Sequence, residues 1–354
     1  IELPPEVVPQ QPEENEEENE EEDSEENEEE NEEEENENEE EKEEPKDNTP
    51  VEKGYAETNI SYNHAWDIVA PKLVNVSELP PQIAEAVSNN TVFMVERDAG
   101  QPAERKLIQL QYTNSEGFMP ETIVAYRLDS DGEIELIIPS HYCEDSKMIR
   151  LIGLTGEYYM VATNDINFND VAPGIWHHEA VSFAAARNLF SGMGRNSFEP
   201  QTNMTRAMFV AVLSRLDAAD LSAYNRSTFI DVEIDSWYGS SIEWALQNGI
   251  IAPEMVLGFG LSYFNPTANI TREEMAVIFA NYLSKRDFPI TTINAPQFDD
   301  LDEASSWARD SISNMRRHSI INGVGHNMYN PQGIATRAEV AQIYTNLVRA
   351  ILGL

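Results

Sequence analysis

The order of apolar and polar positions divides the chain into three parts. Residues 1–50 are mostly Glu and Asn and offer too few apolar positions to build a core. Residues 55–165 contain short runs in which apolar and polar positions alternate, which is typical of half-buried strands. Later in the chain, apolar positions recur with the helical spacing i, i+3, i+4 and i+7. The pattern predicts a disordered segment over 1–54, a small β-rich domain over 55–165 and an all-α region over 166–354.

The middle region predicts several short strands separated by turn residues. After a mixed opening over Trp66–Val76 and Gln82–Val87, strands are expected at Thr91–Glu96, Lys106–Tyr112, Thr122–Arg127, Glu133–Pro139, Met148–Leu151 and Glu157–Ala162. Asp131–Gly132 is a hairpin signal between two of them, and the whole arrangement is typical of a β-sandwich. Asp129, Asp131 and Glu133 resemble a calcium loop, but Ser140 stands where an EF-hand needs its final Glu. These three acids are therefore interpreted as turn residues.

The helical region repeats one series of motifs three times. Each unit opens with Phe-x-Asp, followed by a Trp, a Gly-x-Gly, an aromatic-x-Pro and an Arg six residues after the Pro. The series comprises Asp170, Asp231 and Asp300; Trp176, Trp237 and Trp307; Gly192/Gly194, Gly258/Gly260 and Gly323/Gly325; Phe198, Phe264 and Tyr329; and Arg206, Arg272 and Arg337. The order predicts repeats over 166–227, 228–296 and 297–354. One such unit has little core of its own, so the three are expected to bury their apolar faces against one another.

Each repeat is predicted to consist of a helix, a glycine loop and a second helix. Gly-x-Gly allows positive φ and leaves main-chain N–H groups within reach of a ligand. The second helices should begin at the N-cap residues Thr205, Thr271 and Thr336. A Glu three residues later completes a capping box in the second and third repeats, whereas Met208 takes that place in the first. The second helix of the first repeat is therefore expected to start less firmly.

Charge and cysteine content narrow the class of protein. The chain has 354 residues, 64 acidic and 23 basic, and a net charge of −41; residues 1–50 alone hold 27 acidic and 2 basic side chains. Such charge argues against nucleic acid as a partner. The single cysteine, Cys143, excludes an intrachain disulfide and a Cys-based zinc site. No apolar run is long enough for a membrane span. Because the chain opens on Ile1 without a signal peptide, we expect a mature or truncated piece, or an export signal upstream.

At these motifs the chain resembles the S-layer homology family over about residues 168–354. The matching segments are Phe168–Val171 and Phe229–Val232, and the Thr-Arg-Ala-Glu motif Thr336–Glu339 with its variants Thr271–Glu274 and Thr205–Met208. The resemblance implies a pseudo-threefold bundle of three repeats. It also implies binding of a secondary cell-wall polysaccharide, usually one that carries pyruvylated N-acetylmannosamine. The β-rich segment resembles, more weakly, the stalk-like domains that often precede such triplets.

The resemblance also implies site residues, in grooves between repeats: the Arg, Asp, Trp and Gly-x-Gly residues named above. An Arg fork can bind the carboxylate of a pyruvyl ketal, and N–H groups of the glycine loops can add hydrogen bonds. Each Trp offers an apolar face to a sugar ring or to the core, and each Asp either binds ligand or caps a helix or closes a turn. An Arg at the first helical position is disfavoured by the helix dipole, so three of them indicate that something negative is held there. The second repeat has a longer Trp-to-Arg spacing, which predicts an altered groove.

No catalytic constellation, cofactor or metal site is predicted. Trp176-His177-His178-Glu179 has metal-ligand types, but adjacent His residues point to different helix faces. The predicted function is non-covalent anchoring of an extracellular protein on cell-wall polysaccharide, without enzymatic activity; other surface-layer proteins are a second class of partner. Two alternatives stay open: a structural subunit of an S-layer lattice, and the attachment module of a surface enzyme whose catalytic domain lies upstream.

Overall fold

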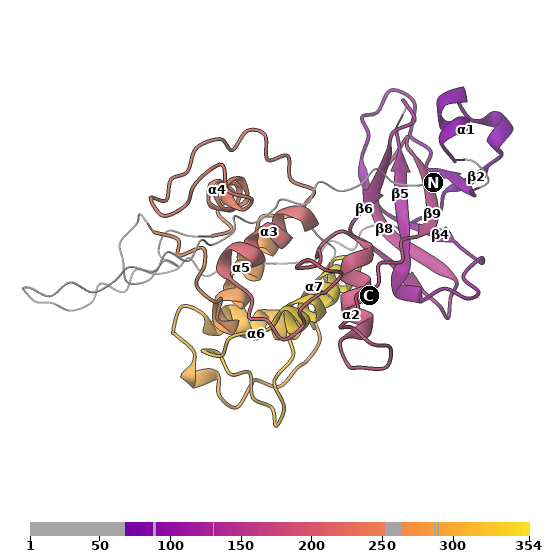
Figure 1. The fold of residues 1–354 in the computed structure, drawn as a ribbon. Helices are drawn as coiled ribbons and strands as arrows, with labels where there is room; N and C mark the ends of the chain where they lie inside the picture. The colour runs from indigo at the N-terminus through magenta and orange to yellow at the C-terminus, as the bar shows by residue number, and fades with distance from the viewer. Residues whose placement is uncertain (1–67, 88–89, 130, 252–262, 287, 289) are drawn as a thin grey trace, which may run out of the picture. The chain divides into compact units, whose positions relative to one another are not determined.

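The structure is a computed structural model that describes residues 68–354 except 88–89, 130, 252–262, 287 and 289 (Figure 1). The predicted disordered segment over 1–54 lies outside the described residues, as do Gly258 and Gly260. The described residues belong to one compact unit. Within it, a β-rich region precedes a helical region, as the sequence predicts. In the part of the chain that the structure describes, no helix combines the length and apolar character that crossing a bilayer requires.

The β-rich region contains two sheets. One has the order β1-β4-β8-β7, with strands Ile68–Val69, Arg105–Gln111, Met148–Leu154 and Ser140–Cys143. The other has the order β2-β3-β9-β5-β6, with strands Lys72–Val74, Val92–Met94, Tyr158–Thr163, Ile123–Leu128 and Ile134–Ile137. Neighbours are antiparallel except β1 and β4. Each of the six predicted runs contains a strand. Strand β7 was not predicted, because its sequence Ser-His-Tyr-Cys lacks a clear apolar alternation.

The two sheets face each other across a shared apolar core. Ile108 and Ile149 of the four-stranded sheet are fully buried against Ile123 and Tyr159 of the five-stranded sheet. The outer face of the five-stranded sheet is covered by α1, Pro81–Val87. The prediction of a sandwich-like domain is therefore confirmed.

The turn between β5 and β6 explains the acidic cluster that resembles a calcium loop. The Asp129 carboxylate accepts hydrogen bonds from the backbone N–H groups of Asp131 and Glu133, both at 2.9 Å. Gly132 has a φ of +87°, which a residue with a side chain rarely adopts. The interpretation of these acids as turn residues is confirmed.

Six α-helices lie in the described part of the helical region. They are α2 (His178–Ala186), α3 (Arg206–Leu216), α4 (Gly239–Gln247), α5 (Arg272–Ser284), α6 (Arg309–Arg317) and α7 (Arg337–Ile351). Helices α3, α5 and α7 each start directly after the predicted N-cap threonine. Complete capping boxes are present at Thr271 and Thr336, whereas Thr205 only accepts from the Met208 N–H at 3.2 Å. The prediction that the capping box of the first repeat is incomplete is therefore confirmed.

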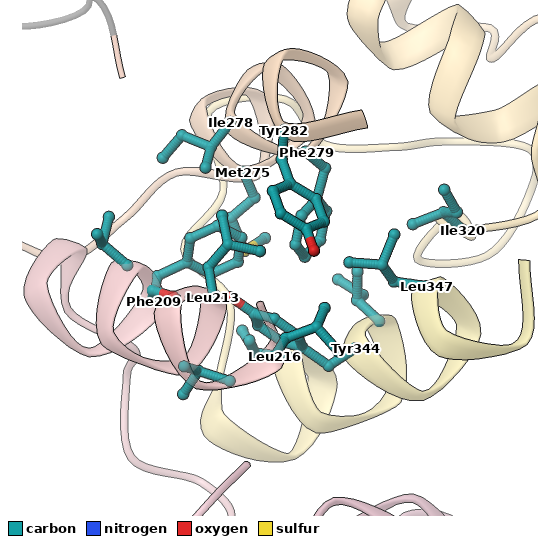
Figure 2. Close-up of a cluster of buried hydrophobic side chains, with 14 of the residues drawn as sticks. Phe209, Leu213, Leu216, Met275, Ile278, Phe279, Tyr282, Ile320, Tyr344 and Leu347 are labelled. Carbon is teal, nitrogen blue, oxygen red and sulfur yellow. Dashed lines mark hydrogen bonds between the residues drawn. The ribbon is translucent and has the colours of Figure 1, made fainter. Parts of the chain in front are cut away.

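Helices α3, α5 and α7 form the centre of the bundle (Figure 2). Three aromatic side chains, one from each helix, meet there: the Phe209 and Phe279 ring centroids are 4.9 Å apart, and Tyr344 lies 5.4 and 5.1 Å from them. Such ring pairs stabilise a core by about 0.5–1.5 kcal/mol each beyond the burial of their area. The Tyr344 hydroxyl donates to the carbonyl of Phe209 at 2.7 Å. The predicted mutual burial of the three apolar faces is confirmed.

Backbone hydrogen bonds close the three repeats into a ring. An arginine is the first residue of each of α3, α5 and α7, and its backbone N–H donates to a backbone carbonyl of another repeat. The pairs are Arg206 to Ala268, Arg272 to Gly333 and Arg337 to Thr202, at 2.8 to 2.9 Å. Each repeat thus binds the next, and the third binds the first. This is the connectivity of a pseudo-threefold bundle.

A buried arginine joins the first repeat to the β-rich region. Arg187, directly after α2, is fully buried and its guanidinium donates to four carbonyls: those of Ser140, Glu121, Ile123 and Phe183, at 2.7, 2.8, 3.1 and 3.2 Å. Arg150 of β8 donates to the carbonyls of Leu352 and Gly353 at the C-terminal end of the bundle. The β-rich region is therefore held to the bundle by directional polar contacts, which the sequence patterns did not predict.

Candidate functional site

The three aspartates of Phe-x-Asp hold the aromatic-x-Pro segment of their own repeat. Their carboxylates accept backbone N–H groups at 2.6 to 2.8 Å: Asp170 from Phe198 and Glu199, Asp231 from Phe264 and Asn265, and Asp300 from Tyr329 and Asn330. Burial raises the pKa of Asp170, but its hydrogen bonds outweigh this and lower the pKa overall. The sequence left three roles open for these aspartates: binding ligand, capping a helix or closing a turn. The structure favours closing a turn.

The two glycines of each described Gly-x-Gly have different tasks. Gly194 and Gly325 adopt φ values of +106° and +114°. The first glycines are needed for space, because a Cβ would lie 2.9 Å from the Ser197 carbonyl oxygen at Gly192 and 2.3 Å from the Met328 carbonyl oxygen at Gly323. Only the second glycine of each pair therefore uses the predicted positive φ.

The tryptophans differ between repeats. Trp176 and Trp237 are 61% and 53% exposed, whereas Trp307 is half-buried and packs on the bundle core. The core alternative therefore applies only to Trp307. The indoles of the first two repeats are available to stack on a sugar ring.

This difference predicts contrasting effects on stability. Replacement of Trp176 or Trp237 by Ala should change the free energy of unfolding by less than about 0.5 kcal/mol, since little packing is lost. Replacement of Trp307 by Ala should lower it by about 1–3 kcal/mol, because a contact with the core is removed. Urea denaturation of the three variants measures both effects. Equal destabilisation by Trp176→Ala and Trp307→Ala would contradict the assignment.

The three arginines are buried at the junctions between repeats. Each Nε donates to the carbonyl of the aromatic residue in the following repeat: Arg206 to Phe264 at 2.9 Å, Arg272 to Tyr329 at 2.7 Å and Arg337 to Phe198 at 2.9 Å. Each guanidinium also lies over the ring of that residue, 4.6 to 4.9 Å from its centroid. The structure therefore brings each predicted Arg to the aromatic segment that the Asp of the neighbouring repeat holds.

Two of these arginines have a carboxylate partner within the chain. Arg206 forms an ion pair with Glu274, and Arg272 Nη1 lies 3.6 Å from Glu339 Oε1. Both glutamates also complete the capping boxes of α5 and α7. From the sequence, these glutamates were assigned to capping only. Their fixed position three residues after each N-cap was the signal that could have identified them as partners of the arginines. The negative partner expected at the helix start is thus intramolecular in two of three cases.

His177 is a buried polar residue that sequence reasoning did not assign to the site. Its ring lies 4.9 Å from the Trp176 ring, and neither ring nitrogen has a hydrogen-bond partner among the described residues. Burial lowers the pKa of His177, while Asp170 acts in the opposite direction. Across the described ranges, no group of three or more His, Cys, Asp or Glu side chains is placed to hold a metal ion.

A cavity of about 470 Å³ lies in the β-rich region, away from every predicted site residue. Its lining includes Phe93, Tyr112, Gln109 and Gln111 and contains no charged side chain. It lacks the cation that recognition of an acidic sugar needs.

Comparison with known proteins identifies the repeats. The S-layer homology domain matches residues 167–208, 228–276 and 297–341. Exoglucanase XynX of Acetivibrio thermocellus is 35% identical over 196 residues, 55% of this chain. The amylopullulanase of Thermoanaerobacterium thermosulfurigenes is 34% identical over 191 residues (54%), and the surface-layer 125 kDa protein of Lysinibacillus sphaericus 30% over 135 residues (38%). The chain spans 17%, 10% and 11% of the length of these relatives.

The repeat motifs, the closed ring of three helical units and the family match agree with one another. S-layer homology domains bind cell-wall polymers and occur at the cell surface. Residues 167–208, 228–276 and 297–341 therefore form three S-layer homology domains, which indicate a protein of the cell surface that is associated with the cell wall.

Proposed function

We propose that the three repeats hold the chain on a secondary cell-wall polysaccharide that carries a pyruvyl ketal. A pyruvyl ketal adds a carboxylate to a sugar ring, so its binding site needs a cation beside an apolar face. The junctions between repeats supply buried guanidinium groups. Charge-assisted hydrogen bonds to carboxylates contribute about 1.5–3 kcal/mol each, which suits non-covalent but lasting attachment.

The observation that carries this proposal is the location of the arginines together with the exposed indoles. Each Arg projects from the start of the C-terminal helix of one repeat onto the aromatic segment of the next. In the first two repeats the Trp of the motif is mostly exposed, although the packing of a core would favour its burial. An exposed indole and a buried cation at a carbohydrate-binding domain are most simply explained by a charged sugar.

We further propose that the described part of the chain is an attachment module without catalytic activity. Two relatives that are named as an exoglucanase and an amylopullulanase share only 17% and 10% of their length with it. This supports the alternative of a module that attaches an enzyme. The named surface-layer relative supports the lattice alternative equally.

The test is sedimentation of the full chain with purified cell-wall sacculi. Intact sacculi should retain the protein, and sacculi stripped of the secondary polysaccharide should not. Mild acid removal of the pyruvyl ketals, with the polymer left in place, should abolish most of the retention because the carboxylate is lost. Retention that survives extraction of the polymer would overturn the proposal and favour the lattice alternative.

A further inference from the structure

The cavity of about 470 Å³ in the β-rich region lies where β1 ends. Strand β1 pairs with β4 only as far as Val69, opposite Ile108, and the chain then crosses to β2 of the other sheet through Ala70 and Pro71. These two residues line the cavity together with residues of β2, β3, β4 and β8, so both sheets contribute to its wall. Its volume falls within the range of small-ligand sites, about 300–1,000 Å³.

The early end of β1 leaves part of the β4 backbone unpaired. On the two flanks of β4, the backbone hydrogen bonds to the β8 side are donated by Thr155 to Glu104 and by Tyr112 to Lys147, both at 2.9 Å. Because the backbone groups of successive residues in a strand point to opposite sides, those of Gln111 point away from β8. In the part of the chain that the structure describes, no strand pairs with Gln111 on that side. Its N–H and C=O therefore offer one donor and one acceptor at the wall of the cavity.

The polar side chains around the cavity are uncharged. Although 25% of the chain is Asp, Glu, Lys or Arg, none of these residues lines the cavity. Its polar lining consists of amide and hydroxyl side chains, each of which can both donate and accept a hydrogen bond, namely Thr91, Gln109, Gln111, Tyr112, Thr113 and Asn114. Such a lining disfavours an ion and suits a neutral ligand that is rich in hydroxyl and amide groups.

An apolar surface lies beside these polar groups. Leu73 and Phe93 stand opposite each other in β2 and β3, and Met148 adds a third apolar side chain from β8. Leu73 is 61% exposed. The ring of Tyr112 meets Tyr142 edge-on, with the centroids 6.0 Å apart, and the Tyr142 hydroxyl donates to the Tyr112 carbonyl at 3.2 Å. These contacts hold the phenol of Tyr112 in place beside a surface that can pack against the C–H face of a sugar ring or against a methyl group.

We propose that this cavity binds a neutral saccharide that carries an acetamido group. The acetamido group has one N–H donor and one C=O acceptor, as a peptide group has, so it can pair with the free N–H and C=O of Gln111. Its methyl group then packs on the apolar side chains, and the sugar hydroxyl groups exchange hydrogen bonds with the uncharged polar lining. The site lies outside the helical repeats and needs no cation, so it goes beyond the proposed function.

An extended peptide is the alternative occupant, because a free strand edge can pair with an added strand. A peptide strand would use the backbone groups of Gln111, but it would leave most of the amide and hydroxyl side chains of the lining without a partner. The hydroxyl groups of a saccharide surround its ring and can reach them. The lining therefore favours the saccharide.

Two neutral disaccharides of the same linkage test the proposal. N,N′-diacetylchitobiose carries an acetamido group on each ring, and cellobiose carries a hydroxyl group at the same position. When each is titrated into the full chain by calorimetry, diacetylchitobiose should bind at one site. Cellobiose should bind at least about tenfold more weakly, because it lacks the amide that pairs with Gln111. Equal binding of the two would overturn the role of the acetamido group, and failure of both to bind the folded chain would overturn the saccharide site.

The substitution Leu73→Ala locates the binding, with Val76→Ala as the matched control. Both residues are exposed and apolar, but only Leu73 lines the cavity. Leu73→Ala should weaken the binding of diacetylchitobiose by about fivefold or more, because it removes part of the apolar wall, and Val76→Ala should leave it unchanged. The melting temperatures of both variants should stay close to that of the unaltered chain, which separates loss of the site from misfolding. Equal affinities of the two variants would show that the disaccharide binds elsewhere.

An acetylated pentapeptide of alternating threonine and valine serves as the competitor. It should not displace diacetylchitobiose, and displacement by the peptide at lower concentration than the sugar would assign the cavity to a peptide strand instead. Retention on sacculi is measured separately and depends on the helical repeats. Either the proposed function or this second site can therefore fail while the other stands.

Discussion

Replacement of Arg187 by Met is expected to lower the free energy of unfolding by about 3–5 kcal/mol. The guanidinium is fully buried and donates to four carbonyl oxygens, two of them in strands of the β-rich region. Burial lowers its pKa to about 9, so it remains charged at neutral pH, and it lies 3.6 Å from the centroid of the Phe183 ring. Methionine fills similar space but donates no hydrogen bond, which leaves those carbonyls buried and unsatisfied.

Scanning calorimetry of the full chain measures this effect. The melting temperature should fall, and the β-rich region should unfold separately from the bundle because a main connection between them is lost. Arg226→Met is the matched control: Arg226 is exposed, and the same substitution there should change the free energy of unfolding by less than about 0.5 kcal/mol. Equal melting temperatures for the two variants would show that Arg187 does not join the two regions.

Acidification is expected to destabilise the fold through His141. Its Nε2 accepts from Arg349 Nε at 3.0 Å, so the ring is neutral in the folded protein. Burial, and then the charges of Arg349, Arg187 and Arg150, lower its pKa to about 3 from an ordinary value of 6.5. The unfolded chain binds a proton below about pH 6.5 that the folded chain refuses until about pH 3. Stability that is present above about pH 6.5 is therefore lost progressively as the pH falls.

Between about pH 7.5 and pH 5 this loss should reach about 2 kcal/mol. Urea denaturation at a series of pH values measures it, with His141→Gln as the control, because glutamine can accept the same hydrogen bond and does not titrate. The variant should lose less stability than the unaltered chain over this range. Parallel pH profiles would mean that other groups cause the acid sensitivity, such as His177 and His318, whose pKa values are also lowered by burial.

The division into repeats and the start of each C-terminal helix were predictable because their signals are local. A threonine N-cap and a glutamate three residues later specify a helix start within one turn. The same holds for Gly194 and Gly325, where the backbone conformation itself requires glycine. The strand β7 and the contacts of Arg187 were missed, since neither follows from the period of the surrounding sequence.

The exposure of the tryptophans could not be predicted in the same way. Trp176, Trp237 and Trp307 occupy the same motif position, yet only Trp307 packs on the core. Burial depends on which neighbours the other repeats supply at that point, and one repeat does not contain this information.

The sequence by itself determined that the chain carries three helical repeats, where their C-terminal helices begin, and the cell-wall-binding family to which the repeats belong. The tertiary structure alone decided how the three equivalent arginines differ. Arg337 reaches Phe198 across 139 residues of sequence, whereas Arg206 and Arg272 each lie beside a glutamate of the next repeat. The physical reason is that an ion pair depends on distance in space. A motif specifies which charge stands at a position, and the fold specifies whether an opposite charge stands beside it.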